Sequence, residues 1–304
     1  MKRYMLLVLK LGLLLALLVA AATTQDLRKI WELIAGANFY YAALFVIVHA
    51  MTAALGSGNL FLLLKPLGRT LAWRRLLFFD LLSLAGSYYT PGGIGGLGGM
   101  ILLMSKEGVG LKDSAVAVLA DKGITLFVAL LFGAVYVKIY GGVFEVEGHG
   151  LTVMLLITVL GGVVMLTSRW VRQSVAKIVD RLQCYKGHYS LLLTNITITA
   201  IIFCLQGLQF YWAFSAAEVR LSDWFLVLLS YGILAIISQL PITFGGAGLS
   251  EAAAVLLWAG LGIGSEQAIA IFLLIRVFTF LATLVLGGGA SVVWLFERRK
   301  AAAV

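Results

Sequence analysis

Long, continuous apolar segments dominate this sequence and leave the chain few ways to fold. Several of them reach the roughly 20 residues that an α-helix needs to cross the hydrocarbon core of a bilayer. A backbone at that depth has no water to bind, so each segment must satisfy its own hydrogen bonds, as a helix does. We therefore predict long helices over residues 4–22, 38–64, 76–90, 114–137, 151–168, 189–214, 222–240 and 266–296.

The composition agrees with a membrane protein and excludes an ordinary soluble domain. Hydrophobic residues make up 62% of the 304 residues and charged residues only 12%, which is more apolar surface than a soluble domain of this size can hide. We predict one integral membrane domain of the all-α class over residues 1–304. Its expected architecture is a polytopic transmembrane helical bundle of eight long helices and two short broken or re-entrant segments.

The basic residues cluster between the apolar runs. The net charge is +9, but this distribution is the positive-inside pattern of cytoplasmic loops, so we expect no nucleic-acid partner. It predicts that both termini are cytoplasmic and that membrane lipids are partners, because anionic headgroups attract such clusters. The clusters contain Lys65, Arg69, Arg74 and Arg75; Arg169, Arg172, Lys177, Arg181 and Lys186; and Arg298, Arg299 and Lys300.

Two Pro/Gly-rich motifs interrupt the apolar pattern at matching places. Pro91–Gly98 reads PGGIGGLG, and Pro241–Gly248, 150 positions later, reads PITFGGAG. Each follows an apolar run and precedes a segment, 97–106 or 247–260, that is too short to span a bilayer as an ideal helix. Proline and glycine are unfavourable inside helices, so paired breaks of this kind are typical of transporter sites.

The repeat predicts two halves, approximately 38–150 and 189–296, of opposite orientation. The short segments either re-enter or cross, and we expect them to cross or at least to lie deep, because crossing makes the basic stretch 169–186 cytoplasmic. Pro91 would then face the outside and Pro241 the cytoplasm. This is the inverted-repeat plan of many secondary transporters.

A helix break at membrane depth frees backbone N–H and C=O groups, which protein or a wet cavity must satisfy. The helix after the break presents N–H groups and the positive end of its dipole, and a phosphate or carboxylate headgroup suits such a site. Close helix packing through small residues is the alternative. The candidate substrate-binding residues of the motifs are Pro91, Gly92, Gly93, Gly95, Gly96, Pro241, Gly245, Gly246 and Gly248.

Four charged residues lie within apolar segments and complete the candidate binding site. Charges there are costly and usually face a partner or water. Glu251 with Arg276 and Asp121 with Lys122 form the expected pairs, and a structural ion pair is the alternative to a headgroup or ion site. Three further groups of polar residues have weaker assignments, as an interfacial Asp80, an internally packed His49, and Gln206, Gln209 and Gln239 facing a cavity or another helix.

The sequence contains none of the motifs that an enzyme site of a common type needs. There is no nucleophile elbow, no HExxH and no cluster of cysteines and histidines with metal-ligand spacing. We therefore predict no enzyme activity, no metal and no cofactor.

With these residues in place, the chain resembles the flippase-like membrane family found as the transmembrane region of lysylphosphatidylglycerol synthases. The resemblance runs from about Lys10 to Leu295 and is strongest at Leu240–Glu251, Pro91–Gly96 and Val118–Lys122. It implies a bacterial or archaeal cytoplasmic membrane protein that translocates lipid or supports lipid and polysaccharide metabolism. Members commonly carry charged residues near the positions of Leu97, Met100 and Ser250, and an Arg at the position of Lys122.

The leading functional hypothesis is a translocator that moves an amphipathic lipid with an anionic or phosphate headgroup between leaflets. Its breaks would hold the headgroup through backbone N–H groups, with Arg276 and Lys122 supplying positive charge. Two alternatives remain: a non-transporting membrane subunit that supports a lipid- or glycan-modifying enzyme, and a membrane-embedded transferase. The 304 residues include no segment resembling the soluble aminoacyl-transfer domain of the synthases, so we do not expect this chain alone to aminoacylate lipid.

Overall fold

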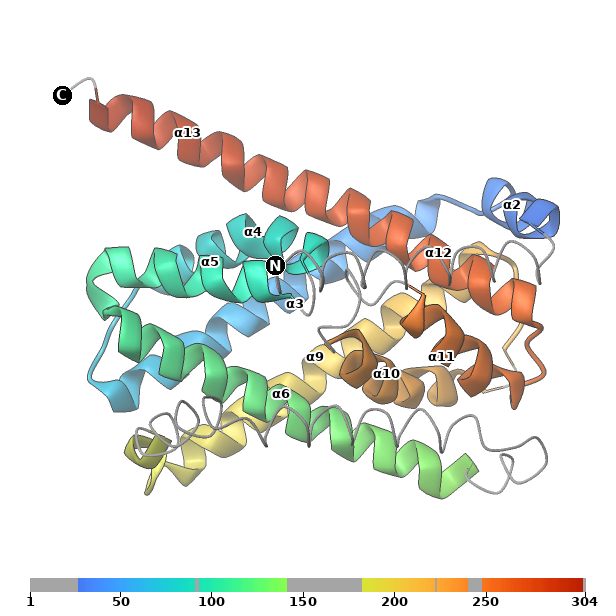
Figure 1. Cartoon of the computed structure of the whole chain (residues 1–304), viewed down its shortest axis with the longest axis horizontal. Helices are drawn as coiled ribbons and strands as arrows, with labels where there is room; N and C mark the ends of the chain where they lie inside the picture. The colour runs from blue at the N-terminus through green and yellow to red at the C-terminus, as the bar shows by residue number, and fades with distance from the viewer. Residues whose placement is uncertain (1–26, 91–92, 141–181, 222, 240–247, 303–304) are drawn as a thin grey trace, which may run out of the picture.

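A computed structural model describes residues 27–90, 93–140, 182–221, 223–239 and 248–302, and these ranges are helical apart from short connections (Figure 1). The predicted helices 4–22 and 151–168 and the basic residues of 169–181 lie outside them. The α-helices are α2 Leu27–Ala35, α3 Tyr40–Leu64, α4 Trp73–Tyr89, α5 Ile94–Met104, α6 Leu111–Tyr140, α9 Tyr189–Ala216, α10 Trp224–Ser238, α11 Leu249–Ala259, α12 Ser265–Ala282 and α13 Gly288–Ala302.

Within these ranges, four helical stretches are long and apolar enough to cross a membrane. They are Tyr40–Leu67, Leu111–Ile139, Tyr189–Ala216 and Ser265–Phe296. The last of these joins α12 to α13 through one π-helical turn, Thr283–Gly287. One continuous helix therefore crosses the top of the view in Figure 1. The helical membrane bundle predicted from the apolar runs is therefore confirmed for the described residues.

Helix α2 is a short helix that we did not predict. Its nine residues span only about 14 Å, too little to cross a bilayer. Ile30 is buried against the bundle, whereas Trp31 is exposed, as in a helix that lies along an interface. Lys29 Nζ lies 3.8 Å from Glu266 Oε2 at the start of α12 and ties α2 to this end of the bundle.

The short segments after the two Pro/Gly motifs fold back as hairpins. Gly86 of α4 lies against the backbone of Gly95 and Gly96 of α5, and an added Cβ at Gly86 would come within 2.9 Å of it. In the second hairpin, Trp258 Nε1 of α11 donates a hydrogen bond of 3.0 Å to Ser230 Oγ of α10. The two helices of each hairpin therefore run antiparallel and in contact.

The described helices fit deep, re-entrant segments and not segments that cross the membrane completely. Helices α5 and α11 have 11 residues each, about 16 Å of helix, which is half of a typical hydrocarbon core. Each hairpin therefore enters the bundle and leaves it at the same end without reaching the far one. The re-entry considered from the sequence turned back the short segment alone. In the structure α4 turns back together with α5, so Arg69 before α4 and Asp113 at the start of α6 lie at the same end, as the crossing scheme also required.

The hairpins enter from opposite ends of the bundle (Figure 1). Two contacts mark the first end, which holds the C-terminus of α3 and the start of α6: Tyr185 OH donates to Leu63 O at 2.8 Å, and Arg69 Nε lies 2.8 Å from Asp113 Oδ2. The α4–α5 hairpin starts there. Asn38 N donates to Ala216 O at 2.9 Å at the second end, where the α10–α11 hairpin starts. Span, hairpin and span thus occur twice, in opposite directions.

The two larger hydrophobic cores lie toward opposite ends of the bundle, and helices of both halves contribute to them. At the second end, the fully buried Trp258 packs edge-on against Phe214, which joins α11 to α9, and Phe45 of α3 belongs to the same core. At the first end, the core contains Leu63 and Met104, both fully buried. A third, smaller cluster of buried residues joins α6, α9 and α10.

The close contact between α4 and α5 generates a prediction on stability. A Cβ at Gly96 would lie 1.8 Å from Ser87 Oγ and 2.8 Å from the Ser87 backbone nitrogen, whereas one at Gly98 meets nothing within 4 Å. We expect Gly96→Ala to lower the free energy of unfolding by about 1–3 kcal/mol, since the hairpin must separate to accept the methyl group. Gly98→Ala is the matched control and should be neutral or slightly stabilising. Thermal unfolding of the purified variants checks this, and equal stability of the two would contradict the hairpin packing.

Candidate functional site

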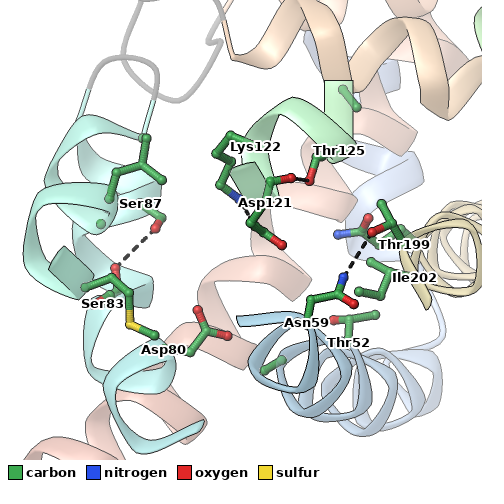
Figure 2. Close-up of a pocket in the computed structure, with 18 of the residues that line it drawn as sticks. Thr52, Asn59, Asp80, Ser83, Ser87, Asp121, Lys122, Thr125, Thr199 and Ile202 are labelled. Atoms are coloured by element: carbon green, nitrogen blue, oxygen red, sulfur yellow. Dashed lines mark hydrogen bonds and ion pairs between the residues drawn. The ribbon is translucent and has the colours of Figure 1, made fainter. Parts of the chain in front are cut away.

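A polar cavity of about 370 Å³ lies in the middle of the bundle (Figure 2). Six helices line it: α3, α4, α5, α6, α9 and α10. It contains residues from the middle of the spanning helices together with residues from the inner ends of both hairpins. The lining residues that carry the argument are His49, Thr52, Asn59, Asp80, Ser83, Ser87, Gly93, Gly96, Asp121, Lys122, Thr125, Thr199, Gln206, Ser238 and Gln239.

The polar lining comes from residues spaced along one face of each helix. On α3, His49, Thr52 and Asn59 recur at helical spacing in an otherwise apolar run, and on α4 Asp80 and Ser83 do the same. Residues three or four apart share one face of a helix, so these stripes turn together toward one space. This periodicity was the signal in the sequence that could have located the cavity, and the sequence reasoning missed it.

Two buried polar atoms of the lining have no protein partner among the described residues. Asn59 is 2% exposed, and its Nδ2 donates 3.0 Å to Thr199 Oγ1, but its Oδ1 has no hydrogen-bond partner. Ser83 is 7% exposed, and its Oγ likewise has none. Burying such groups without a partner costs about 1–3 kcal/mol each. Both therefore favour water or a polar ligand in the cavity.

The predicted pair of Asp121 and Lys122 lies in the cavity wall. Lys122 Nζ is 3.5 Å from Asp121 Oδ2, and Figure 2 shows the ammonium turned toward that carboxylate. The Asp121 side chain is 15% exposed and the Lys122 side chain 42% exposed, so the lysine is the more accessible of the two. Lys122 can therefore contact a ligand while remaining close to Asp121.

Asp80 lies inside the cavity, not at the membrane interface as we predicted. The interfacial assignment came from its position near the basic residues 65–75. Helix α4 continues inward from that end, and the side chain of Asp80 points into the cavity from the side opposite Asn59 (Figure 2). Asp80 and Asp121 thus bring two carboxylates to one space that contains one lysine.

The described part of the first Pro/Gly break supplies lining residues, and several of its N–H groups already have protein partners. Gly93 and Gly96 line the cavity. However, Gly95 N donates to Thr90 Oγ1 at 2.7 Å, and the Gly96 and Leu97 nitrogens both donate to Gly93 O at 3.1 Å. The expectation that these N–H groups await a headgroup is therefore wrong. Gly95 and Gly96 instead let α4 approach closely, which was the alternative.

The second break is described only at its two ends. Ser238 and Gln239, which precede it, line the cavity, and Gly248 follows it at the start of α11. Pro241, Gly245 and Gly246 lie outside the described residues, as do Pro91 and Gly92 of the first break. Their predicted role in substrate binding stays a prediction.

Glu251 and Arg276 form the predicted ion pair, away from the cavity. Arg276 Nε donates to Glu251 Oε1, and the guanidinium lies 5.6 Å from the ring centre of Phe272. Glu251 Oε2 also accepts a hydrogen bond of 2.7 Å from Gly248 N, which caps α11. None of these residues lines the central cavity. The pair therefore joins α11 to α12, which fits the structural alternative.

The three glutamines divide between the two roles considered for them. Gln206 and Gln239 line the cavity, whereas Gln209 is 3% exposed and donates 2.9 Å to Phe45 O, joining α9 to α3. Within the described part of the chain, no three His, Cys, Asp or Glu side chains gather as a metal site. The cavity thus offers charged, amide and hydroxyl groups as its binding chemistry.

The ion pair of α11 and α12 leads to a prediction on stability. Their side chains are 15% and 32% exposed, so removal of one partner leaves the other charge partly buried. We expect Arg276→Gln and Glu251→Gln each to lower the free energy of unfolding by about 1–3 kcal/mol, and the double variant to lose less than the sum of both. Arg69→Gln, which breaks the exposed pair with Asp113, should cost at most about 1 kcal/mol. Additive losses in thermal unfolding would argue against the pair.

Comparison with known proteins agrees with the helical bundle and its motifs. Neither the curated proteins nor the solved structures gave a significant match. A family model described as "Lysylphosphatidylglycerol synthase TM region" matches residues 7–287, which include both Pro/Gly motifs and every described residue of the cavity. This chain is therefore a member of the lysylphosphatidylglycerol synthase transmembrane-region family of membrane proteins.

Proposed function

We propose that this protein moves a phospholipid between leaflets by passing its headgroup through the central cavity. The observation that carries the proposal is a central cavity that contains a lysine and is lined by residues of two hairpins from opposite ends of the bundle. Polar groups at membrane depth are costly and mark pathways for polar substrates or ions. Membership of a family named for a lipid-modifying synthase makes a lipid the substrate class of choice.

Lys122 is the group that would bind the headgroup phosphate. Its ammonium is the one cation among the described lining residues, since Arg276 pairs with Glu251 outside the cavity. A lysine binds phosphate as a point charge with three donors. The Ser83 hydroxyl, which has no protein partner, is a second donor in the same space. Leu97 and Met100 make the α5 wall apolar and leave the charge chemistry to α4 and α6.

The arrangement of the hairpins supports alternating exposure of this cavity. Residues of both hairpins line the cavity, and the two larger hydrophobic cores lie toward opposite ends of the bundle. In many transporters with inverted repeats, one repeat rocks against the other around a fixed central site. The same motion here would open the cavity first to one leaflet and then to the other.

The charge distribution supports a cytoplasmic position for the first end of the bundle. This end gathers Lys65, Arg69, Arg74, Arg75, Lys106, Lys112 and Lys186 against the acids Glu107 and Asp113. At the second end, the basic residues Arg28, Lys29, Lys138 and Arg220 are balanced by the acids Glu32, Glu218, Asp223 and Glu266. By the positive-inside rule, the first end, and the C-terminus of α13 that extends past it in Figure 1, would face the cytoplasm.

Lipid movement can be measured directly in reconstituted vesicles. Phosphatidylcholine vesicles would carry a trace of acyl-labelled fluorescent phosphatidylglycerol, and dithionite would bleach the outer leaflet. We expect the protein to make the inner label accessible, and Lys122→Gln to slow this by about tenfold or more, because a charge-assisted contact of 1.4 kcal/mol or above is lost. Lys112→Gln removes an exposed lysine at the start of α6 and should change nothing. No acceleration over empty vesicles would refute the proposal and favour a supporting subunit.

The orientation can be tested by cysteine labelling in cells. The two native cysteines, Cys184 and Cys204, would first be changed to serine. With a membrane-impermeant maleimide, we expect Arg220→Cys at the second end to be labelled in intact cells. Lys112→Cys at the first end should react only after permeabilisation. The reverse pattern would invert the orientation, and labelling of both in intact cells would contradict the arrangement of the ends.

A further inference from the structure

Among the described residues, the cavity lining has one more acidic side chain than basic side chains. Its described lining includes the carboxylates of Asp80 and Asp121 and the ammonium of Lys122. Lys122 lies 3.5 Å from Asp121, and no salt-bridge partner lies within 4.0 Å of Asp80 among the described residues. Arg276, on the same bundle, is held by Glu251 outside the cavity. Within the part of the chain that the structure describes, Asp80 is therefore the cavity carboxylate without an ion-pair partner of its own.

Protonation of a carboxylate that has no ion-pair partner would favour entry of a phosphate headgroup at this depth. A bare charge in the interior of a membrane protein is costly, and a phosphate brought beside it adds like-charge repulsion. The described elements packed on α4 offer no second cation at this level. Helix α5 has no titratable residue, α3 presents His49, and the charged residues of α13 lie at its far C-terminal end. Helix α6 contributes Asp121 and Lys122 across the cavity.

We propose that Asp80 carries a proton together with each lipid, so that translocation is a lipid–proton symport. The inference rests on the proposed function and adds its energy source. A proton from the acidic side binds a carboxylate oxygen of Asp80, the headgroup then binds at Lys122, and both leave when the cavity opens to the alkaline side. A phosphate headgroup of charge −1 and one proton cross together as a neutral pair, with no net movement of charge.

Two further observations point to a hydrated path around Asp80. The Ser83 hydroxyl lies one turn along α4 from Asp80, and the Asn59 Oδ1 comes from α3 across the cavity; both are buried and lack protein partners among the described residues. Water that satisfies these atoms would also link Asp80 to the remainder of the cavity. A proton can therefore reach Asp80 through the same space that the headgroup uses.

The proposal is tested by the distribution of lipid under a pH gradient. The same vesicles would contain trace labelled phosphatidylglycerol, a gradient of one pH unit, and potassium with valinomycin to clamp the membrane potential. For one proton per lipid, the label should accumulate about tenfold in the leaflet that faces the alkaline side. Asp80→Asn mimics the protonated carboxyl and should still equilibrate the label but without any asymmetry.

The controls separate the coupling from the translocation itself. Asp80→Glu keeps a titratable group and should retain the asymmetry, and Asp113→Asn, which removes an acid at the first end of the bundle, should retain it as well. Equal label in both leaflets with the unmodified protein would overturn the symport and leave the proposed function standing. Asymmetry driven by a sodium gradient at constant pH would assign the site to Na⁺ instead. If the label does not move at all, the proposed function fails and the symport fails with it.

Discussion

The limited length of the two hairpins is the constraint on which the rest of the structure depends. Helices α5 and α11 stop about halfway through the thickness of a bilayer. A full-length helix in either place would fill the middle of the bundle with apolar side chains. Because the hairpins end there, the middle of α3, α6 and α9 can place polar residues around a cavity inside the bundle. The short length of α5 and α11 therefore creates the cavity, and the polar side chains then set its chemistry.

The long helices could be predicted from the sequence because bilayer thickness fixes their length and composition. The predicted segment 189–214 became Tyr189–Ala216, and 38–64 became Tyr40–Leu64. The Pro/Gly motifs located the hairpin turns for the same kind of reason, since proline and glycine weaken a helix wherever it packs. Helix α2 was missed, because nine residues with an exposed tryptophan do not form an apolar run.

The candidate site was predicted only in part, because a sequence does not show which helix faces pack together. Asp121 and Lys122 were assigned to the site from their charge alone, and they do line the cavity. Glu251 and Arg276 have the same chemistry and pair elsewhere. Asp80 was placed at the interface from its basic neighbours in sequence, although only the direction of α4 decides its depth. The role of a single polar residue such as Asn59 could not be assigned from the sequence, because its partner Thr199 is 140 positions away along the chain.

The two halves place comparable basic residues in different electrostatic surroundings. Arg276 of α12 pairs with Glu251 on the neighbouring short helix α11. Lys122 of α6 lies beside Asp121, the preceding residue of the same helix. Arg276 therefore joins two helices of the second half, whereas Lys122 of the first half lines the cavity.

The hydrogen bond from Asn59 to Thr199 joins α3 of the first half to α9 of the second, and these two antiparallel helices pack along much of their length. A joint of this kind resists separation more than it resists rotation. The α3–α9 contact would therefore be kept in a rocking movement of one half against the other. The two hairpins would move relative to this contact.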